Sequence, residues 1–127
     1  MRLILDAGAL IALERDAAQY WRRVAQLLRT DARSPLTHAG VIAQVWRGGA
    51  GRQAGLARAL PGMEIVSFDL PLARAAGVLL ARSGLSDAID AAVVALAVDG
   101  DRILTSDPDD IDMLAVAAGR RVDIVAT

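Results

Sequence analysis

Residues 1–15 read MRLILDAGALIALER and place a short apolar strand directly before a helix. Residues 3–5 (Leu-Ile-Leu) form an uninterrupted apolar run, which is typical of a strand buried in a parallel sheet. Asp6 ends this run, and residues 7–14 carry apolar side chains at helical spacing. A strand followed at once by a helix is the first half of a parallel crossover unit. The opening residues therefore predict an α/β fold.

The alternation of strands and helices continues along the rest of the chain. Clear strands are predicted at 64–68, 102–105 and 122–125, and Ser34-Pro35 marks a turn that could carry a short strand. Helices are predicted at 17–30, 37–47, 52–60, 69–82, 86–98 and 108–119, with Thr37 and Ser86 opening two of them. We expect a three-layer α/β/α sandwich with a mostly parallel sheet, residues 3–5 central, and one domain over residues 1–127.

The composition excludes several kinds of chemistry. All 14 cationic residues are Arg, so mechanisms that need a Lys, such as a Schiff base or a P-loop, are excluded. The absence of Cys and the single His exclude disulfides, zinc–thiolate sites and His-rich metal sites. The net charge of −1 argues against a basic protein that coats nucleic acid. The longest apolar run, residues 91–98, is too short to cross a membrane, and the N-terminus shows no signal-peptide pattern, so we expect a soluble cytoplasmic protein with no membrane partner.

Acidic residues stand where a parallel sheet usually binds its ligands. Asp6 and Asp107 both follow predicted strands, and ligands of open parallel sheets bind beyond the carboxyl ends of the strands. Asp87 and Asp90 lie three residues apart near the start of a helix. Asp90 is the only polar residue between Ala88 and Val98, so the helix around it should be buried. A buried carboxylate needs a cation, an Arg or strong hydrogen-bond donors.

Helix capping is the alternative interpretation for three of these acids. Asp6 could cap the helix that follows it. Asp107 precedes Pro108 in a favourable helix start, so capping is the stronger interpretation for that residue taken alone. Asp87 could be an acid of the first helical turn after Ser86. Capping does not account for Asp90, which lies inside the apolar helix.

Several carboxylates at one edge, without Cys or a His cluster, favour a hard cation that prefers oxygen ligands. Mg²⁺ and Mn²⁺ fit such a donor set best. A cluster of acids repels a phosphate group, whereas a bound divalent ion reverses the sign. The ion would then activate water and stabilise the leaving oxygen of a phosphodiester.

The sequence resembles the PIN domains, and among them the VapC-type toxin ribonucleases of bacterial toxin–antitoxin pairs. Four motifs carry the resemblance: LILDA at 3–7, GVIAQVWR at 40–47, DAIDAAVVALA at 87–97 and ILTSDPDD at 103–110. They follow the family's order and span nearly the whole chain. The resemblance implies a PIN-like fold and a Mg²⁺- or Mn²⁺-dependent endoribonuclease. It also implies a small antitoxin partner and a homodimer.

The resemblance also implies roles for the acids. Asp6 is similar to the first acid of the family's quartet, Asp90 to the third and Asp107 to the fourth. Asp87 is similar to a further acid that often lies one turn before the third. These four residues, Asp6, Asp87, Asp90 and Asp107, are the predicted metal ligands. Asp110 resembles an additional acid of the last motif, with helix capping as its favoured role.

Gln44 departs from the family pattern. The second acid of the quartet is normally a Glu, and Gln44 occupies its place in the motif at 40–47. The predicted catalytic set is therefore Asp6, Gln44, Asp90 and Asp107. An amide offers a carbonyl oxygen to a metal, but it adds no charge and cannot act as a base. Another acid compensates, or the protein is impaired, or the Glu was deliberately replaced to disarm a toxin.

Arginines in the middle of the chain are candidates for RNA binding. Arg47 and Arg52, with Arg58 nearby, surround a Gly-rich loop beside Trp46. They could bind phosphates while Trp46 faces a base. The alternative is an ordinary solvated face, with Trp46 in the core or in a dimer seam.

Large apolar residues on the second helix suggest a protein interface. Tyr20 and Trp21 lie beside two arginines, and the apolar content of residues 20–28 and 41–46 favours a homodimer or an antitoxin helix as partner.

Three other readings compete with the ribonuclease. A catalytically weak PIN-fold module that sequesters antitoxin or binds RNA is favoured by Gln44. A haloacid-dehalogenase-like phosphatase needs a second Asp two residues after the first, but Gly8 stands there and the chain has no Lys. A phosphate-receiver domain fails for the same missing Lys.

Overall fold

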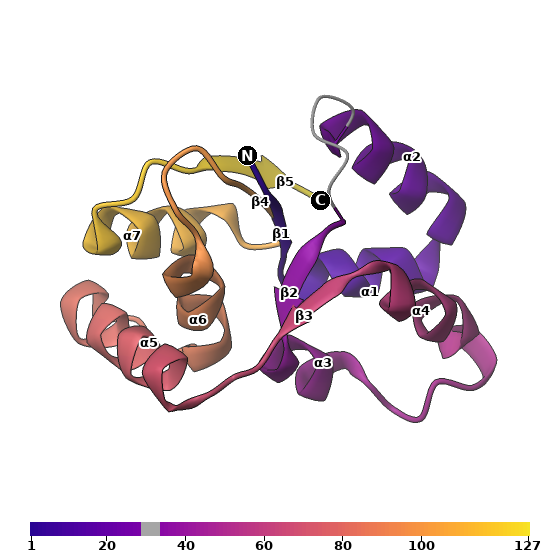
Figure 1. The fold of residues 1–127 in the computed structure, drawn as a ribbon, viewed down its shortest axis with the longest axis horizontal. Coiled ribbons are helices and arrows are strands. Elements are labelled where there is room, and N and C mark those ends of the chain that lie inside the picture. Colours follow the sequence, from indigo (N-terminus) through magenta and orange to yellow (C-terminus); the bar gives the residue numbers. More distant parts are fainter. Residues whose placement is uncertain (29–33) are drawn as a thin grey trace.

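Strands and helices alternate along the residues that the structure describes, 1–28 and 34–127, in a computed structural model (Figure 1). The first half contains β1 (Leu3–Leu5), α1 (Ala7–Arg15), α2 (Ala17–Leu28), β2 (Leu36–His38), α3 (Ala39–Val45), η1 (Gly51–Gln53), α4 (Ala54–Ala59) and η2 (Leu60–Gly62). The second half contains β3 (Glu64–Val66), α5 (Leu70–Ser83), α6 (Ala88–Leu96), β4 (Arg102–Thr105), α7 (Pro108–Ala118) and β5 (Asp123–Ala126). The last two residues of the helix predicted at 17–30 lie outside the described residues.

The strands form one parallel sheet. Its order is β3-β2-β1-β4-β5, and every strand pair in the described part of the chain is parallel. Ile4 is paired with Leu36 on one side and with Ile103 on the other, so β1 is the central strand, as predicted. All carboxyl ends of the strands therefore lie at one edge of the sheet.

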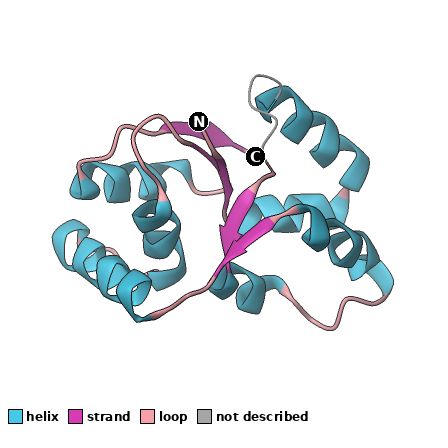
Figure 2. Ribbon diagram, viewed as in Figure 1, coloured by secondary structure: helices cyan, strands magenta, loops and turns pink. Residues whose placement is uncertain are grey.

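Helices cover both faces of this sheet (Figure 2). Helices α1 to α4 lie on one side of the sheet, and α5, α6 and α7 pack together on the other. The predicted three-layer α/β/α sandwich is confirmed. No helix in the described ranges has the length and apolar character needed to cross a membrane.

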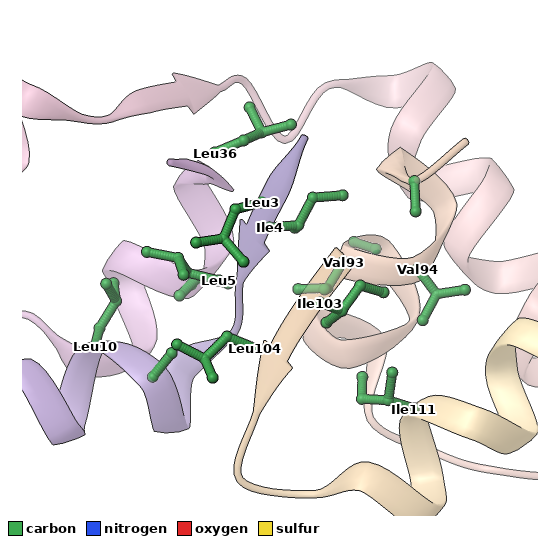
Figure 3. Close-up of a cluster of buried hydrophobic side chains, with 14 of the residues drawn as sticks. Leu3, Ile4, Leu5, Leu10, Leu36, Val93, Val94, Ile103, Leu104 and Ile111 are labelled. Atoms are coloured by element: carbon green, nitrogen blue, oxygen red, sulfur yellow. The ribbon is translucent and has the colours of Figure 1, made fainter. Parts of the chain in front are cut away.

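Aliphatic side chains fill the core on both faces of the central strands. Figure 3 shows side chains of β1 and β4 meeting those of α1, α6 and α7. Leu3, Ile4, Leu5 and Ile103 have no exposed surface. Such strands are apolar along their whole length because each face of a parallel sheet is covered. Shortening one of these side chains to Ala costs about 2–5 kcal/mol of stability.

The predicted starts of two helices were wrong. Thr37 is not an N-cap: it lies in β2, where its hydroxyl donates to the Leu5 carbonyl oxygen over 2.8 Å. Residues 36–38 extend because both neighbouring strands pair with them, and α3 begins after His38, whose Nδ1 accepts from the Gly40 N–H. Helix α6 begins after Asp87, not at Ser86. The Asp87 carboxylate accepts two N–H groups of the first turn, so it is the N-cap residue.

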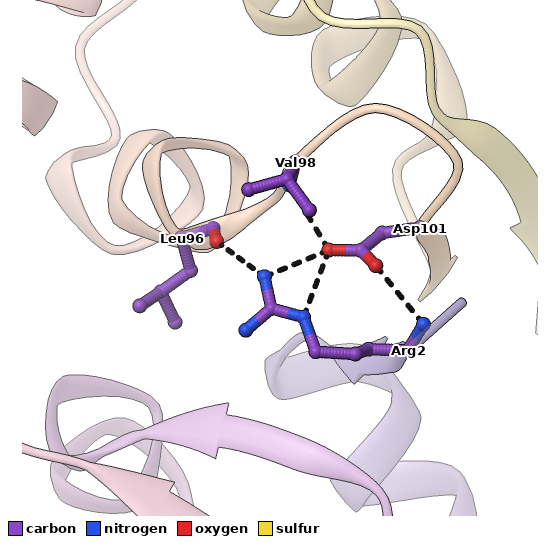
Figure 4. A network of polar contacts seen from close by, with 4 residues as sticks. All are labelled: Arg2, Leu96, Val98 and Asp101. Carbon is purple, nitrogen blue, oxygen red and sulfur yellow. Dashed lines mark hydrogen bonds and ion pairs between the residues drawn. The ribbon is translucent and has the colours of Figure 1, made fainter.

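A polar network closes the opposite, amino edge of the sheet (Figure 4). Arg2 Nη2 and Nε donate to Asp101 Oδ2 over 2.8 and 3.1 Å, and Arg2 Nη2 also donates to the Leu96 carbonyl oxygen. Burial raises the pKa of Asp101, but hydrogen bonds from Arg2 and from the Val98 N–H outweigh it and hold that pKa below its ordinary value. This network joins the starts of β1 and β4 and leaves the carboxyl edge free for a site.

Candidate active site

A pocket of about 270 Å³ opens at the carboxyl edge of the sheet and is here called the acidic pocket. Its lining contains five of the predicted site residues, Asp6, Gln44, Asp87, Asp90 and Asp107. They come from four separate parts of the chain: the end of β1, α3, the start of α6 and the loop after β4. The parallel topology brings them together because β1 and β4 are neighbours and α6 packs beside them.

Asp6 both caps a helix and belongs to the pocket. Its Oδ1 accepts a hydrogen bond from the Ala9 N–H over 2.8 Å and so caps α1. Capping was one of the two roles predicted for Asp6. Its Oδ2 accepts from the Thr105 hydroxyl and from the Ser106 N–H. Burial raises the pKa of Asp6, although the hydrogen bonds from Thr105 and Ala9 act in the opposite direction. The carboxylate is thus held in one orientation by β4.

Close packing between α1 and the loop after β4 also shapes the pocket. A Cβ atom placed on Gly8 would lie 1.9 Å from Ser106 Oγ and 2.3 Å from Ser106 Cβ. No larger residue fits at position 8 unless the backbone moves. The haloacid-dehalogenase alternative needed an Asp at this position, so the packing counts against it.

Asp107 stands at the N-cap position of α7, but its side chain makes no capping hydrogen bond. The capping interpretation, which the local sequence favoured, is therefore wrong for the carboxylate. The Asp107 backbone N–H donates to the Thr105 hydroxyl over 2.9 Å, and the residue is exposed at the pocket. Asp110 lies in the first turn of α7, and burial together with the nearby Asp107 raises the pKa of Asp110.

Asp90 is the buried acid that the sequence singled out. It is 9% exposed, and no hydrogen bond offsets the burial of its carboxylate among the described residues. Burial, followed by repulsion from Asp87, Asp6 and Asp107, raises the pKa of Asp90 to about 7. The other three carboxylates therefore lie close enough to repel that of Asp90. A cation in this pocket would relieve that repulsion.

The donor chemistry of the acidic pocket fits a hard divalent ion. Its polar side chains offer oxygen ligands from four carboxylates, one amide and one hydroxyl, the kind of ligand that Mg²⁺ and Mn²⁺ prefer. Over residues 1–28 and 34–127, however, no three His, Cys, Asp or Glu side chains are grouped so that they could hold an ion. The acids line the pocket without forming a closed ligand set.

Gln44 is one of three residues that line both the acidic pocket and a second, larger one. Its side chain is exposed on α3 and lines both. The position that the resemblance assigns to a Glu therefore faces the same space as Asp6, Asp90 and Asp107. The role of Gln44 in catalysis stays a prediction.

The second pocket, of about 420 Å³, is here called the arginine pocket. It is lined by Ile11, Glu14, Arg15, Gln44, Val45, Arg47, Arg52 and Gln53. Arg47 and Arg52 were predicted from the Gly-rich loop, whereas Arg58 does not line this pocket. Arg15 and Gln53 were missed. Neither residue carries a local sequence signal, because α1 comes to lie beside α3 and η1 only through tertiary packing.

The aromatic residues divide between the core and the surface. Tyr20 is 5% exposed and packs edge-on against Trp21, so the prediction that it faces a partner was wrong. Trp21 and Trp46 are 38% and 36% exposed. Trp46 therefore does not belong to the core; its ring rests against Gly49, where a Cβ would lie 2.4 Å away.

Comparisons with known proteins show a likeness in fold but none in sequence family. No protein-family model matches the chain, and no curated protein matches its sequence. A chain in the crystal structure of VapBC2 from Rickettsia felis, bound to a DNA fragment from their promoter, superposes with a TM-score of 0.70. The match covers 98% of both chains at 15% sequence identity. The two chains share a fold, and the predicted PIN-like architecture is confirmed at that level.

Proposed function

We propose that this chain is a Mg²⁺- or Mn²⁺-dependent endoribonuclease that acts as the toxin of a toxin–antitoxin pair. The observation that carries the proposal is the meeting of Asp6, Asp87, Asp90 and Asp107 at one pocket, at the edge where parallel sheets bind ligands. The likeness in fold to a VapBC2 chain supports the same assignment. The sequence resemblance to VapC-type toxins supports it independently.

The four Asp side chains line the pocket without forming a closed ligand set, so they would hold the ion after turning towards it, and the Gln44 amide would contribute at most a neutral oxygen. The bound ion would supply activation of water and stabilisation of the leaving oxygen. The surrounding residues orient the carboxylates: the Thr105 hydroxyl holds Asp6, and backbone N–H groups hold Asp87. Arg47 and Arg52 would draw the RNA backbone towards the acids.

We propose a small antitoxin protein as the partner, a homodimer as the assembly and the cytoplasm as the location. The neighbour in the comparison is a VapBC2 complex on promoter DNA. Ile11 and Trp21 are large apolar side chains that remain 39% and 38% exposed on α1 and α2. Val24, Val41 and Val45, which contributed to the prediction of a dimer, are buried in the chain's own core.

A binding module without efficient catalysis is the second candidate function. The neutral Gln44 at the acidic pocket favours it, because one charge of the expected set is missing. Such a protein would bind RNA or sequester an antitoxin without cutting.

Metal-dependent cleavage separates the two functions. Purified protein is incubated with total cellular RNA across a Mn²⁺ titration and, separately, with EDTA. We expect cleavage that requires Mn²⁺, is lost in Asp90→Asn and is retained in the matched control Asp112→Asn, an exposed acid of α7 that does not line the acidic pocket. Intact RNA at every Mn²⁺ concentration would contradict the nuclease. Equal loss in both variants would contradict the assigned site.

A further inference from the structure

The acidic pocket and the arginine pocket lie next to each other. They share Ile11, Gln44 and Val45 in their linings. Helix α1 runs beneath both, with Gly8 at the acidic pocket and Arg15 at the arginine pocket. Seven residues of helix advance about 10 Å along the axis. An RNA strand lying along α1 would therefore contact both pockets at once.

The charges of the two pockets are opposite. Four carboxylates line the acidic pocket, whereas three Arg and one Glu line the arginine pocket. The acidic pocket repels a polyanion until a cation is bound. Of the two pockets, only the arginine pocket can therefore attract a phosphodiester chain in the absence of metal.

A buried amide holds the arginine pocket in shape. Gln53 is 5% exposed, and its Oε1 accepts from the N–H groups of Arg47 and Gly49 over 2.7 and 3.2 Å. Its Nε2 donates to the Val45 carbonyl oxygen over 2.8 Å and to Glu14 Oε2 over 3.4 Å. The loop that carries Arg47 is thus fastened to the end of α3.

Glu14 orients one of the arginines. Arg52 Nε lies 3.2 Å from Glu14 Oε1, with Glu14 15% exposed and the Arg52 side chain 90% exposed. The guanidinium is therefore anchored through Nε while most of its surface faces the pocket and solvent. A guanidinium presents donors in a planar fork that matches a phosphate.

We infer that the arginine pocket is a phosphate subsite, in which Arg15, Arg47 and Arg52 bind a phosphate of single-stranded RNA next to the one at the acidic pocket. The inference rests on the proposed function, which it extends by a second contact to the substrate strand. The subsite needs no metal ion, because its donors are guanidinium groups. It supplies affinity, and the acidic pocket supplies the reaction.

Binding without metal tests the subsite. Anisotropy of a fluorescein-labelled single-stranded RNA is titrated with full-length protein in EDTA, for wild type, Arg15→Gln, Arg52→Gln and the matched control Arg74→Gln. Arg74 is an exposed residue of α5, on the opposite face of the sheet. We expect each arginine-pocket variant to bind about tenfold more weakly, equivalent to 1.4 kcal/mol. Each should also reduce the slope of log K against log salt by roughly 0.7, as one lost phosphate contact predicts.

Two results would overturn the subsite. One is affinity and salt slope in Arg15→Gln and Arg52→Gln equal to those of Arg74→Gln. The other is no binding by the wild type in EDTA. Thermal melts of all variants verify that each is folded, and both substituted side chains are exposed. Cleavage in Mn²⁺ is measured alongside. Cleavage without arginine-dependent binding contradicts the subsite alone, whereas arginine-dependent binding without cleavage contradicts the nuclease alone.

Discussion

His38 Nε2 donates a hydrogen bond to the carbonyl oxygen of Ile89, 3.0 Å away, and so ties β2 to the first turn of α6. Its Nδ1 accepts from the Gly40 N–H at the start of α3, which fixes the neutral ring with its proton on Nε2. The ring is fully buried and packs edge-on against Phe68. This one side chain therefore positions both α3, which carries Gln44, and α6, which carries Asp90.

His38 should make the protein less stable in acid. Burial lowers the pKa of His38, although the hydrogen bond to Ile89 opposes the shift. The unfolded chain then binds the proton more readily than the folded chain. The stability that the neutral, buried ring contributes is therefore complete above pH 6.5 and is lost as the pH falls below that value. His38→Asn keeps a capping acceptor, and its stability should fall less than that of wild type between pH 6.5 and 5. Urea unfolding across this range measures the difference, and parallel curves for the two proteins would refute it.

Asp90 should make the protein less stable as the pH rises, which is opposite to the effect of His38. Its pKa in the folded protein is raised to about 7, so the folded state binds the proton more tightly than the unfolded state. The stability that Asp90 contributes in its protonated form is complete below about pH 4 and is lost as the pH rises through 7. Without metal, Asp90→Asn should therefore be more stable than wild type at pH 8, by about 2–4 kcal/mol at most.

Mn²⁺ should narrow that difference in stability. A ligand at a hundredfold excess over Kd adds about 2.7 kcal/mol to the stability of the native state. Wild type should gain this increment and Asp90→Asn should not. Thermal melts at pH 8 with EDTA and with millimolar Mn²⁺ measure both effects. If the two proteins gain equally, the ion binds elsewhere.

The fold was largely predictable because strand and helix periodicities are local properties. The exception was β2. Its three residues are too few to show a clear strand periodicity, and pairing with β1 and β3 decides their conformation. Tyr20 was misjudged for a related reason: an aromatic residue among arginines is typical of a surface, but α2 packs against α1 and Tyr20 is buried.

The acids of the candidate site were predictable, whereas most of the arginine pocket was not. Asp6 and Asp107 follow strands, and Asp90 interrupts an apolar helix, so each has a local signal. Arg15 and Gln53 meet only because α1 lies beside α3 and η1. That contact depends on tertiary packing, which no pattern in the sequence encodes locally.

Gly8 should tolerate no side chain, in contrast to Gly77. A Cβ at position 8 meets the Cβ of Ser106, so Gly8→Ala must displace the loop that carries Asp107. Overpacking of this kind costs about 1–3 kcal/mol, and metal affinity should fall with it. Gly77 lies in α5 with open space at its Cβ position, so Gly77→Ala should stabilise the protein by about 0.5–1 kcal/mol. Thermal melts and Mn²⁺ titrations of both variants test the contrast, which fails if the two respond alike.

Gln44→Glu should raise activity at low metal concentration. For phosphodiester cleavage with two divalent ions, the site must hold a total charge of +4, with the ions about 4 Å apart. Asp6, Asp90 and Asp107 supply −3, and a Glu at position 44, which lines the same pocket, would supply the fourth negative charge. At 4 Å an opposite charge contributes about 4 kcal/mol at an effective dielectric of 20, before desolvation.

A third of that energy already changes metal affinity about tenfold. The Gln44 oxygen can coordinate an ion but provides none of this attraction, so wild type should need about ten times more Mn²⁺ than Gln44→Glu for the same rate of RNA cleavage. Gln26→Glu adds the same charge on an exposed part of α2 and should leave the Mn²⁺ dependence unchanged. If wild type and Gln44→Glu cleave at equal rates at every Mn²⁺ concentration, position 44 does not act on the ion, and Asp87, which also lines the pocket, is the residue that supplies the fourth charge.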